Sequence, residues 1–204
     1  MRLVILGATG GIGRLLLRYA LERGHEVTAF VRSPQKITLK HERLKVVQGN
    51  LLDAGQLATV MAGHDAVLSA FGPVTLGPTT MRALFGGAVA EAMRLSAVRR
   101  ILLVSSAFLF SEMFFFGRVL RGMLFGNVVV DDAGMELAIC RDYLDWTIVR
   151  PPRLTNGSLT QKYRVMEDRL PEGRMRVSRA DVADFMLHEV EKPAHRQQIV
   201  GVAG

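Results

Sequence analysis

Three glycines near the N-terminus, Gly7, Gly10 and Gly13, have the spacing Gly-x-x-Gly-x-x-Gly. The apolar run before them, residues 3–6, is typical of a buried strand, and an amphipathic helical pattern begins after Gly10. In that context Gly7 permits a sharp turn, Gly10 lets backbone approach a phosphate, and Gly13 lets the helix pack closely. The amino end of the helix then offers N–H groups and a positive dipole to a dinucleotide pyrophosphate. Other residues of the same turn are expected to take part: Thr9, Gly11 and Ile12. The alternative is a glycine-rich turn that binds nothing.

The end of the second predicted strand, residues 25–31, indicates which dinucleotide fits. A site for NAD places an acidic residue there, about twenty positions after the glycines, to bind the ribose 2′-hydroxyl. This chain has Arg32 and Ser33 instead, with Lys36 close by. A guanidinium is permanently charged and offers fixed donors, so it suits a 2′-phosphate. The sequence therefore predicts NADP (NADPH) as cofactor, the alternative being that Arg32 is an ordinary exposed arginine.

The stretch Ser69-Ala-Phe-Gly-Pro73 ends the fourth predicted strand. Its small residues would let the backbone pass near the cofactor ribose and pyrophosphate, which makes Ala70, Phe71 and Gly72 candidate contacts. Gly72 and Pro73 are equally compatible with a plain turn.

These candidates need a scaffold that brings them together. Apolar runs predict strands at residues 3–6, 25–31, 44–47, 65–71, 100–105, 146–149 and 198–202. Helical patterns lie between them: after Gly10, over 56–61 with Asp53 as N-cap, and over 78–97, 131–143 and 179–191. This alternation predicts an α/β fold, a Rossmann-type doubly wound parallel sheet with helices on both faces. Ligands of such sheets bind beyond the carboxyl ends of the strands. No repeat or linker interrupts the pattern, so residues 1–204 are expected to form one NAD(P)-binding domain.

Composition narrows the class of protein. The hydrophobic content of 49% and mean hydropathy of +0.21 suit strands that are buried on both faces. The formal charge is +7, but no basic run exceeds two residues and no basic stripe alternates with aromatics, so nucleic-acid binding is not expected. The single cysteine excludes an internal disulfide, and no cleavable signal peptide or transmembrane segment is recognised, so a cytoplasmic location is expected. We predict no metal site.

The opening Gly7-Ala-Thr-Gly-Gly-Ile-Gly13 resembles the atypical, NmrA-like branch of the short-chain dehydrogenase/reductase superfamily. Further likeness is to the flavin reductase/biliverdin-IXβ reductase family. It includes Leu76-Gly-Pro-Thr-Thr80, Ser105-Ser-Ala-Phe-Leu109, Arg150-Pro-Pro152 and Ser178-Arg-Ala-Asp-Val-Ala-Asp-Phe-Met186. The resemblance implies that NADPH delivers hydride directly to a flat conjugated acceptor, with the proton coming from solvent.

The resemblance also implies roles for individual residues. Asn50 and Leu51 stand where related reductases hold the adenine with an aspartate and an apolar residue. Ser106 stands where the superfamily places a substrate-orienting hydroxyl, with Ser105 beneath it; the alternative is a serine that caps a turn. Arg153 replaces a histidine of the family and could hold a substrate carboxylate or phosphate, although a surface arginine is equally compatible.

Backbone at the end of the sixth strand is a further candidate. Arg150, Pro151 and Pro152 could present a carbonyl or N–H to the nicotinamide carboxamide, because two prolines stiffen the chain there. Contact through backbone implies that replacing these side chains has little effect.

One expected motif is missing. Many members of the superfamily use Tyr-x-x-x-Lys, in which the lysine lowers the tyrosine pKa for proton transfer. None of Tyr19, Tyr143 and Tyr163 has a lysine four residues on. Ordinary alcohol–ketone chemistry is therefore not expected.

A phenylalanine-rich segment, residues 108–125, has three interpretations. It contains six of the ten phenylalanines but is too short and too interrupted by arginine to cross a membrane. It is ordinary core, an apolar lid over a flat substrate, or a contact patch for a partner or membrane surface. We expect a monomer or a homodimer.

Two functions follow from these patterns. The first is an NADPH-dependent oxidoreductase acting on a small flavin-like or similar conjugated substrate. The second is a non-catalytic NADP(H)-binding protein that senses the redox ratio, for which the missing proton-transfer pair argues. A sugar-nucleotide epimerase or dehydratase is disfavoured, because only residues 155–173 are free to build a substrate lobe.

Overall fold

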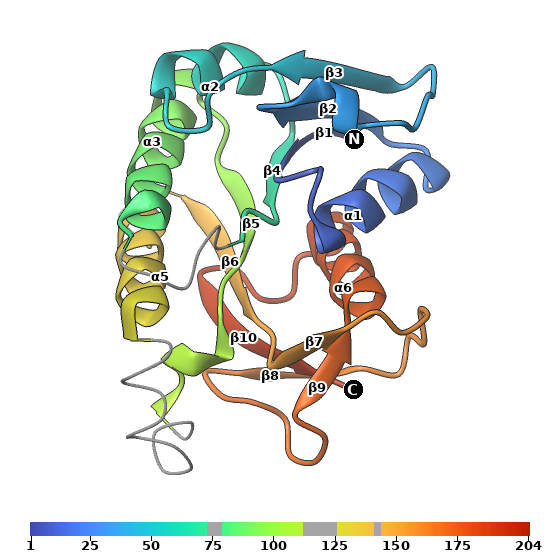
Figure 1. Ribbon diagram of the computed structural model, residues 1–204, viewed down its shortest axis with the longest axis vertical. Helices are drawn as coiled ribbons and strands as arrows, with labels where there is room; N and C mark the ends of the chain where they lie inside the picture. The colour runs from blue at the N-terminus through green and yellow to red at the C-terminus, as the bar shows by residue number, and fades with distance from the viewer. Residues whose placement is uncertain (73–78, 112–125, 141–143) are drawn as a thin grey trace.

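The computed structural model describes residues 1–72, 79–111, 126–140 and 144–204. Its first part alternates strands and helices as predicted: β1 (Arg2–Leu6), α1 (Gly11–Glu22), β2 (Glu26–Val31), β3 (Leu44–Gln48), α2 (Ala54–Met61), β4 (Ala66–Ser69), α3 (Met81–Ser96) and β5 (Arg100–Val104). The remainder contains α5 (Gly126–Ile139), β6 (Asp145–Arg150), β7 (Arg153–Thr155), β8 (Arg164–Glu167), β9 (Arg176–Ser178), α6 (Arg179–Glu191) and β10 (Gln198–Ala203). Two 3₁₀ turns, η1 (Pro34–Lys36) and η2 (Ala107–Leu109), follow β2 and β5 (Figure 1).

The strands form one large sheet in the order β3-β2-β1-β4-β5-β6-β10-β8. All neighbouring pairs from β3 to β10 are parallel, as predicted, and β8 pairs antiparallel with β10. The chain runs outward from β1 to β3 and then crosses back to β4 on the other side of β1. Ligands of doubly wound sheets bind at the carboxyl ends of the strands where the order reverses, here between β1 and β4.

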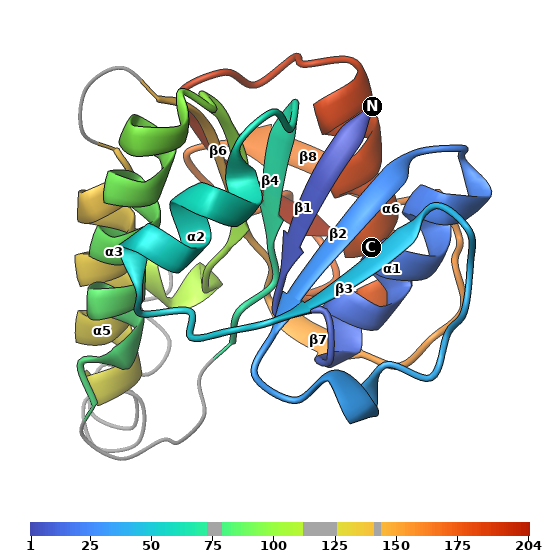
Figure 2. The same ribbon diagram turned by 90° about the horizontal axis from the view of Figure 1, so that it is seen from above.

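Helices cover both faces of the sheet. Helices α1 and α6 pack on one face, and α2, α3 and α5 cover the other (Figure 2). Within the described part of the chain, no helix combines the length and the apolar character that crossing a bilayer requires.

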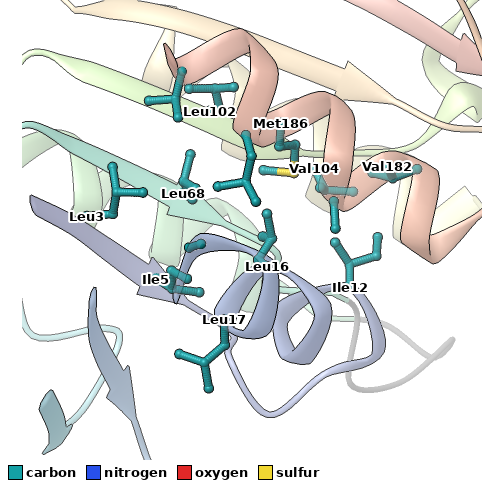
Figure 3. Packing of buried hydrophobic residues seen from close by; sticks show 14 of the residues in the cluster. Leu3, Ile5, Ile12, Leu16, Leu17, Leu68, Leu102, Val104, Val182 and Met186 are labelled. Atoms are coloured by element: carbon teal, nitrogen blue, oxygen red, sulfur yellow. The ribbon is translucent and has the colours of Figure 1, made fainter. Parts of the chain in front are cut away.

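The core beneath α1 and α6 explains the position of the first turn. Leu16 of α1 is fully buried and lies near Leu68 of β4 and Met186 of α6 (Figure 3). Full burial of such a side chain contributes about 1.5–3 kcal/mol. Because several apolar residues of α1 face this layer, the helix is fixed over β1 with its amino end at the carboxyl edge of the sheet.

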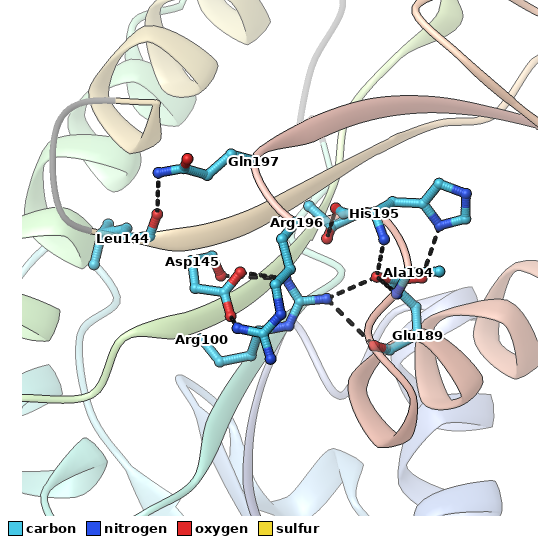
Figure 4. Close-up of polar contacts among 9 residues, drawn as sticks. Arg100, Leu144, Asp145, Glu189, Ala194, His195, Arg196 and Gln197 are labelled. Atoms are coloured by element: carbon cyan, nitrogen blue, oxygen red, sulfur yellow. Dashed lines mark hydrogen bonds and ion pairs between the residues drawn. The ribbon is translucent and has the colours of Figure 1, made fainter.

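A buried ionic cluster fixes the opposite, amino edge. Arg100 of β5 contacts Asp145 Oδ1 at 3.2 Å and Glu189 Oε1 at 3.0 Å, and His195 Nδ1 lies 2.8 Å from Glu189 Oε2 (Figure 4). The cluster joins the starts of β5 and β6 to the end of α6. It lies away from the carboxyl ends of the strands, so it holds the scaffold and takes no part in the ligand cleft.

Three strands and one helix start were not predicted. Strands β7 and β9 form a separate two-stranded parallel sheet, and β8 makes the antiparallel edge. The helix predicted at 131–143 is α5, which begins at Gly126 and ends at Ile139. Its first turn contains Val128-Val-Val130, whose β-branched side chains favour a strand, so the pattern did not indicate a helix there.

Candidate functional site

A cavity of about 580 Å³ opens at the carboxyl ends of β1, β2 and β3. Seven of the predicted cofactor residues line it: Gly7, Thr9, Arg32, Ser33, Asn50, Leu51 and Phe71. Other lining residues carried no signal in the sequence: Phe30, Val31, Gln48, Gly49, Leu52, Gln56 and Met81. Segments that are far apart in the chain therefore meet at one hollow, as the fold class predicts.

The glycine turn has the geometry that its spacing predicts. Gly7 has a φ of +77°, and a Cβ there would lie 2.7 Å from the carbonyl carbon of Ala70. A Cβ on Gly13 would lie 2.1 Å from the carbonyl oxygen of Gly7. Both positions exclude a larger residue, Gly7 by backbone conformation and Gly13 by the close approach of α1 to β1.

The amino end of α1 is open. Its N-cap residue is Gly10, which has no side chain to cap the first N–H groups, and the first turn contains no acidic residue. The first N–H groups of a helix lack intrahelical partners and attract anions. The first turn therefore contains nothing that would repel an anion, and the Arg179 side chain lies over Gly11 there.

Cationic side chains lie at the end of β2. Arg32 and Lys36 both line the cavity and are exposed. Among the described residues, neither lies within ion-pair distance of a carboxylate. Ser33 occupies the N-cap position of η1, but its hydroxyl makes no capping hydrogen bond. This wall therefore retains its positive charge and a free hydroxyl for an incoming phosphate.

The far end of the cavity is shaped by a turn after β3. Asn50 Oδ1 accepts from the Leu52 N–H at 3.0 Å, and the Asn50 N–H donates to Gln56 Oε1 at 3.1 Å. Asp53 caps α2 as predicted, accepting from the Gln56 N–H at 3.0 Å. The Asn50 amide oxygen thus holds the turn, and its amide nitrogen is left as a donor.

The turn after β4 forms the inner wall. The Ala70 N–H donates to the Leu6 carbonyl at 2.9 Å, and the Phe71 ring packs against Phe85 with centroids 4.6 Å apart. Phe71 therefore gives the cavity a fixed apolar surface. Gly72 is described, and a Cβ there would meet nothing within 4 Å, so sterics do not require glycine at this position.

Two serines follow β5 in different environments. Ser106 caps η2, its Oγ accepting from the Phe108 N–H at 3.2 Å, so the capping role considered for it is present. Its hydroxyl proton can still be donated. Ser105 is buried, and its Oγ has no hydrogen-bond partner among the described residues.

The end of β6 departs from expectation in one respect. Arg150 forms a two-pronged pair with Glu136 of α5, at 3.0 and 2.5 Å, and its guanidinium stacks on Phe110 at 4.8 Å. The pair joins β6 to α5 in the interior, so we now expect that replacing this side chain lowers stability, in contrast to the expectation from the sequence. The Pro151 carbonyl accepts from the Ala107 N–H at 3.2 Å, while Pro152 is half-buried.

Arg153 begins β7 and is exposed. Its register partner in β9 is Arg176. No hydrogen bond or ion pair of its side chain occurs among the described residues, so its guanidinium is available to an anion. Of the phenylalanine-rich segment, Phe110 is buried and Phe108 half-buried; residues 112–125 lie outside the described ranges, as does part of the 76–80 motif.

A buried acidic cluster lies on α5, where it packs against the start of α3. Asp131 accepts from the Arg82 and Ala83 N–H groups at 3.1 and 2.9 Å and so caps α3. Asp132 is fully buried and lies 2.8 Å from the Arg82 guanidinium. The pKa of Asp132 is raised to about 6, mainly by burial; the Arg82 charge opposes this rise, and Glu136 and Asp131 add to it. The sequence analysis missed this cluster; two adjacent acids in an apolar helix, with Glu136 one turn further on, could have indicated it.

Comparison with known proteins agrees with this geometry. A family model described as NAD(P)H-binding matches residues 7–193. The structure of a candidate epimerase from Bacteroides thetaiotaomicron is 29% identical, with a TM-score of 0.87 over 99% of this chain and 96% of that chain.

Two further solved structures show the same fold. An anaerobilin reductase from Escherichia coli O157:H7, ChuY, is 24% identical, with a TM-score of 0.84 over 100% of this chain and 97% of that one. A short-chain dehydrogenase/reductase from Veillonella parvula in complex with NADP is 22% identical, with a TM-score of 0.77 over 100% and 94%. The chain belongs to the NAD(P)H-binding family, which agrees with its resemblance to the atypical short-chain dehydrogenase/reductases.

Proposed function

We propose that this protein is an NADPH-dependent reductase that delivers hydride to a small, flat, conjugated acceptor. The observation that carries the proposal is the cavity at the carboxyl ends of β1, β2 and β3. The amino end of α1 lies beside it, and Arg32 and Lys36 line it without a carboxylate partner among the described residues. The ordinary length and charge of NADP match these features: the pyrophosphate at α1 and the 2′-phosphate at Arg32.

Different residues of this chain are proposed to bind different parts of the cofactor. Backbone N–H groups at the start of α1 hold the pyrophosphate, and Arg32 with Ser33 holds the 2′-phosphate. Asn50 and Leu51 border the adenine, and Phe71 supports the ribose side. When bound, the cofactor supplies the hydride; the protein fixes its position and excludes water from one face.

The proton is proposed to come from solvent. Of the tyrosines that the structure describes, Tyr163 donates to Asp184 Oδ2 at 3.0 Å beside α6, and burial together with Asp184 raises its pKa. Tyr19 lies on α1 against Arg18. Neither lies at the ends of β5 and β6, where Ser106 could orient an acceptor carbonyl or ring nitrogen through its hydroxyl. A conjugated acceptor does not require a tyrosine as proton donor, because water readily protonates its reduced form.

The first residues of the phenylalanine-rich segment, 108–111, lie within the described ranges. Phe110 is part of a small buried cluster with Ala107 and Leu170, next to Ser106. This buried apolar cluster beside Ser106 would suit a flat ring system as substrate. Arg153, exposed on β7, is proposed to meet a carboxylate or phosphate on that substrate.

The test is oxidation of NADPH, followed at its own absorbance, with a panel of flavins and quinones as acceptors. Turnover with at least one planar acceptor is expected, and Ser106→Ala should lower kcat without changing NADPH affinity. If NADPH binds tightly but no acceptor of the panel is reduced, the proposed reductase activity is contradicted. In that outcome, a difference in affinity between NADPH and NADP would favour the redox-sensing alternative, since sensing requires differential binding.

A further inference from the structure

A second arginine crosses the amino end of α1. The side chain of Arg179, the first residue of α6, lies directly over Gly11, the first residue of α1. A Cβ on Gly11 would lie 2.7 Å from Arg179 Cδ and 2.8 Å from its Nε. The contact places the Arg179 side chain beside the helix terminus, in a hollow that shares no lining residue with the cavity that holds Arg32.

The partners of this guanidinium are neutral. Arg179 Nη1 donates to Asn156 Oδ1 at 2.7 Å. Among the described residues, no carboxylate lies within ion-pair distance of it, whereas the buried Arg82, Arg100 and Arg150 each contact one. An arginine has five N–H donors, so most of those on Arg179 remain available.

The carboxylate two residues further on, Asp181, is occupied by other donors. Asp181 accepts from the Thr160 and Gln161 N–H groups at 2.8 and 3.0 Å and from the Ser178 hydroxyl at 2.8 Å. Ser178 in turn caps α6 through the Asp181 N–H. The start of α6 is thus satisfied without the Arg179 side chain, which lines a hollow of about 460 Å³ together with Gly11 and Asn156.

We propose that Arg179 is a second anchoring cation for the dinucleotide, binding its pyrophosphate at the start of α1. Asn156 holds the guanidinium in place, and Gly11 provides the space for it to cross the helix. The inference rests on the proposed function, since it assumes that a dinucleotide binds there. It assigns the two cations to different phosphates: Arg32 to the 2′-phosphate and Arg179 to the pyrophosphate.

The experiment compares two ligands by calorimetry: NADP and adenosine 2′-monophosphate, which lacks the pyrophosphate. Arg179→Gln is expected to weaken NADP binding about tenfold or more and to leave adenosine 2′-monophosphate unchanged. Arg32→Gln should weaken both. Arg18→Gln is the matched control, because Arg18 lines the same hollow but is exposed and pairs with Glu22.

Gly11→Ala tests the geometry without removing charge. Gly11 does not have a left-handed φ, so alanine fits the backbone but displaces the Arg179 stem. It should lower NADP affinity as Arg179→Gln does, and the double variant should lose little more. Unchanged NADP affinity in Arg179→Gln, or an equal loss for both ligands, overturns the assignment. A wild-type protein that binds neither ligand refutes the proposed function itself, which separates the two failures.

Discussion

At the scale of single residues, the glycine turn shows how much a spacing can specify. Gly7 needs a left-handed φ, and Gly13 needs the absence of a Cβ; both requirements follow from a strand that turns directly into a helix. The turn could therefore be predicted from three glycines and the apolar runs around them.

Gly13→Ala should destabilise the protein, because its Cβ would meet the Gly7 carbonyl at 2.1 Å and push α1 away from β1. Overpacking of this kind costs about 1–3 kcal/mol in unfolding free energy. Gly87→Ala is the control: Gly87 is exposed on α3 with nothing within 4 Å, and alanine there should be neutral or stabilise by up to about 1 kcal/mol. Denaturant unfolding of both variants makes the comparison, and equal stabilities would refute this account of the turn.

The acidic cluster behind the site should make stability depend on pH. Because the folded-state pKa of Asp132, about 6, lies above its ordinary value of 3.8, folding favours the protonated carboxyl. Its contribution to stability is complete below about pH 4 and is lost as pH rises through 6. Asp132→Asn mimics the neutral form. The unfolding free energy of Asp132→Asn minus that of the wild type should be roughly 2 kcal/mol larger at pH 7 than at pH 4.5.

Urea unfolding at a series of pH values measures this difference. Glu42→Gln, at an exposed carboxylate, serves as the control and should show no such trend. A difference between Asp132→Asn and wild type that does not vary with pH would contradict the assignment. The sequence did not predict this cluster, since Arg82 comes from another helix and only the packing of α3 on α5 places it beside Asp132.

At the scale of elements, the pair between β6 and α5 makes the carboxyl edge rigid. Arg150→Met leaves Glu136 buried without its partner, and breaking a buried pair costs about 3–5 kcal/mol. Arg18→Met removes an exposed pair with Glu22 and should cost under about 1 kcal/mol. Thermal unfolding compares the two. The double variant Arg150→Met/Glu136→Leu should recover much of the loss, and a single variant as stable as the control would refute the role of the pair.

The main elements could be predicted because buried parallel strands are apolar throughout and amphipathic helices separate them. The short strands could not. Strands β7 and β9 have three residues each, too few for a periodic pattern, and β8 depends on pairing with β10 at the far end of the chain. Val128-Val-Val130 favoured a strand locally, but α5 packs against α3 through Gly86 and Gly134, and that tertiary contact determines the helix.

At the scale of the whole molecule, the sheet concentrates the cofactor candidates at one edge. Candidates predicted after β1, β2, β3 and β4 line one cavity because parallel strands all end at the same side, whereas those predicted after β5 and β6 do not line it. The Arg100 cluster holds the opposite edge, so changes there should affect stability and leave the cavity intact. The wall at Arg32 could be predicted from the lack of an acid after β2. The crossing of Arg179 over Gly11 could not, because it depends on how α6 packs beside α1.

The central claim is that the extra phosphate of NADP binds at Arg32. Its most direct measurement is calorimetric titration of the wild type and of Arg32→Gln with NADP and with NAD. The account predicts that the wild type prefers NADP, and that Arg32→Gln loses about ten- to a hundredfold in NADP affinity while NAD affinity changes little. Equal affinity of the wild type for the two nucleotides, or an Arg32→Gln variant that binds NADP as before, would contradict it.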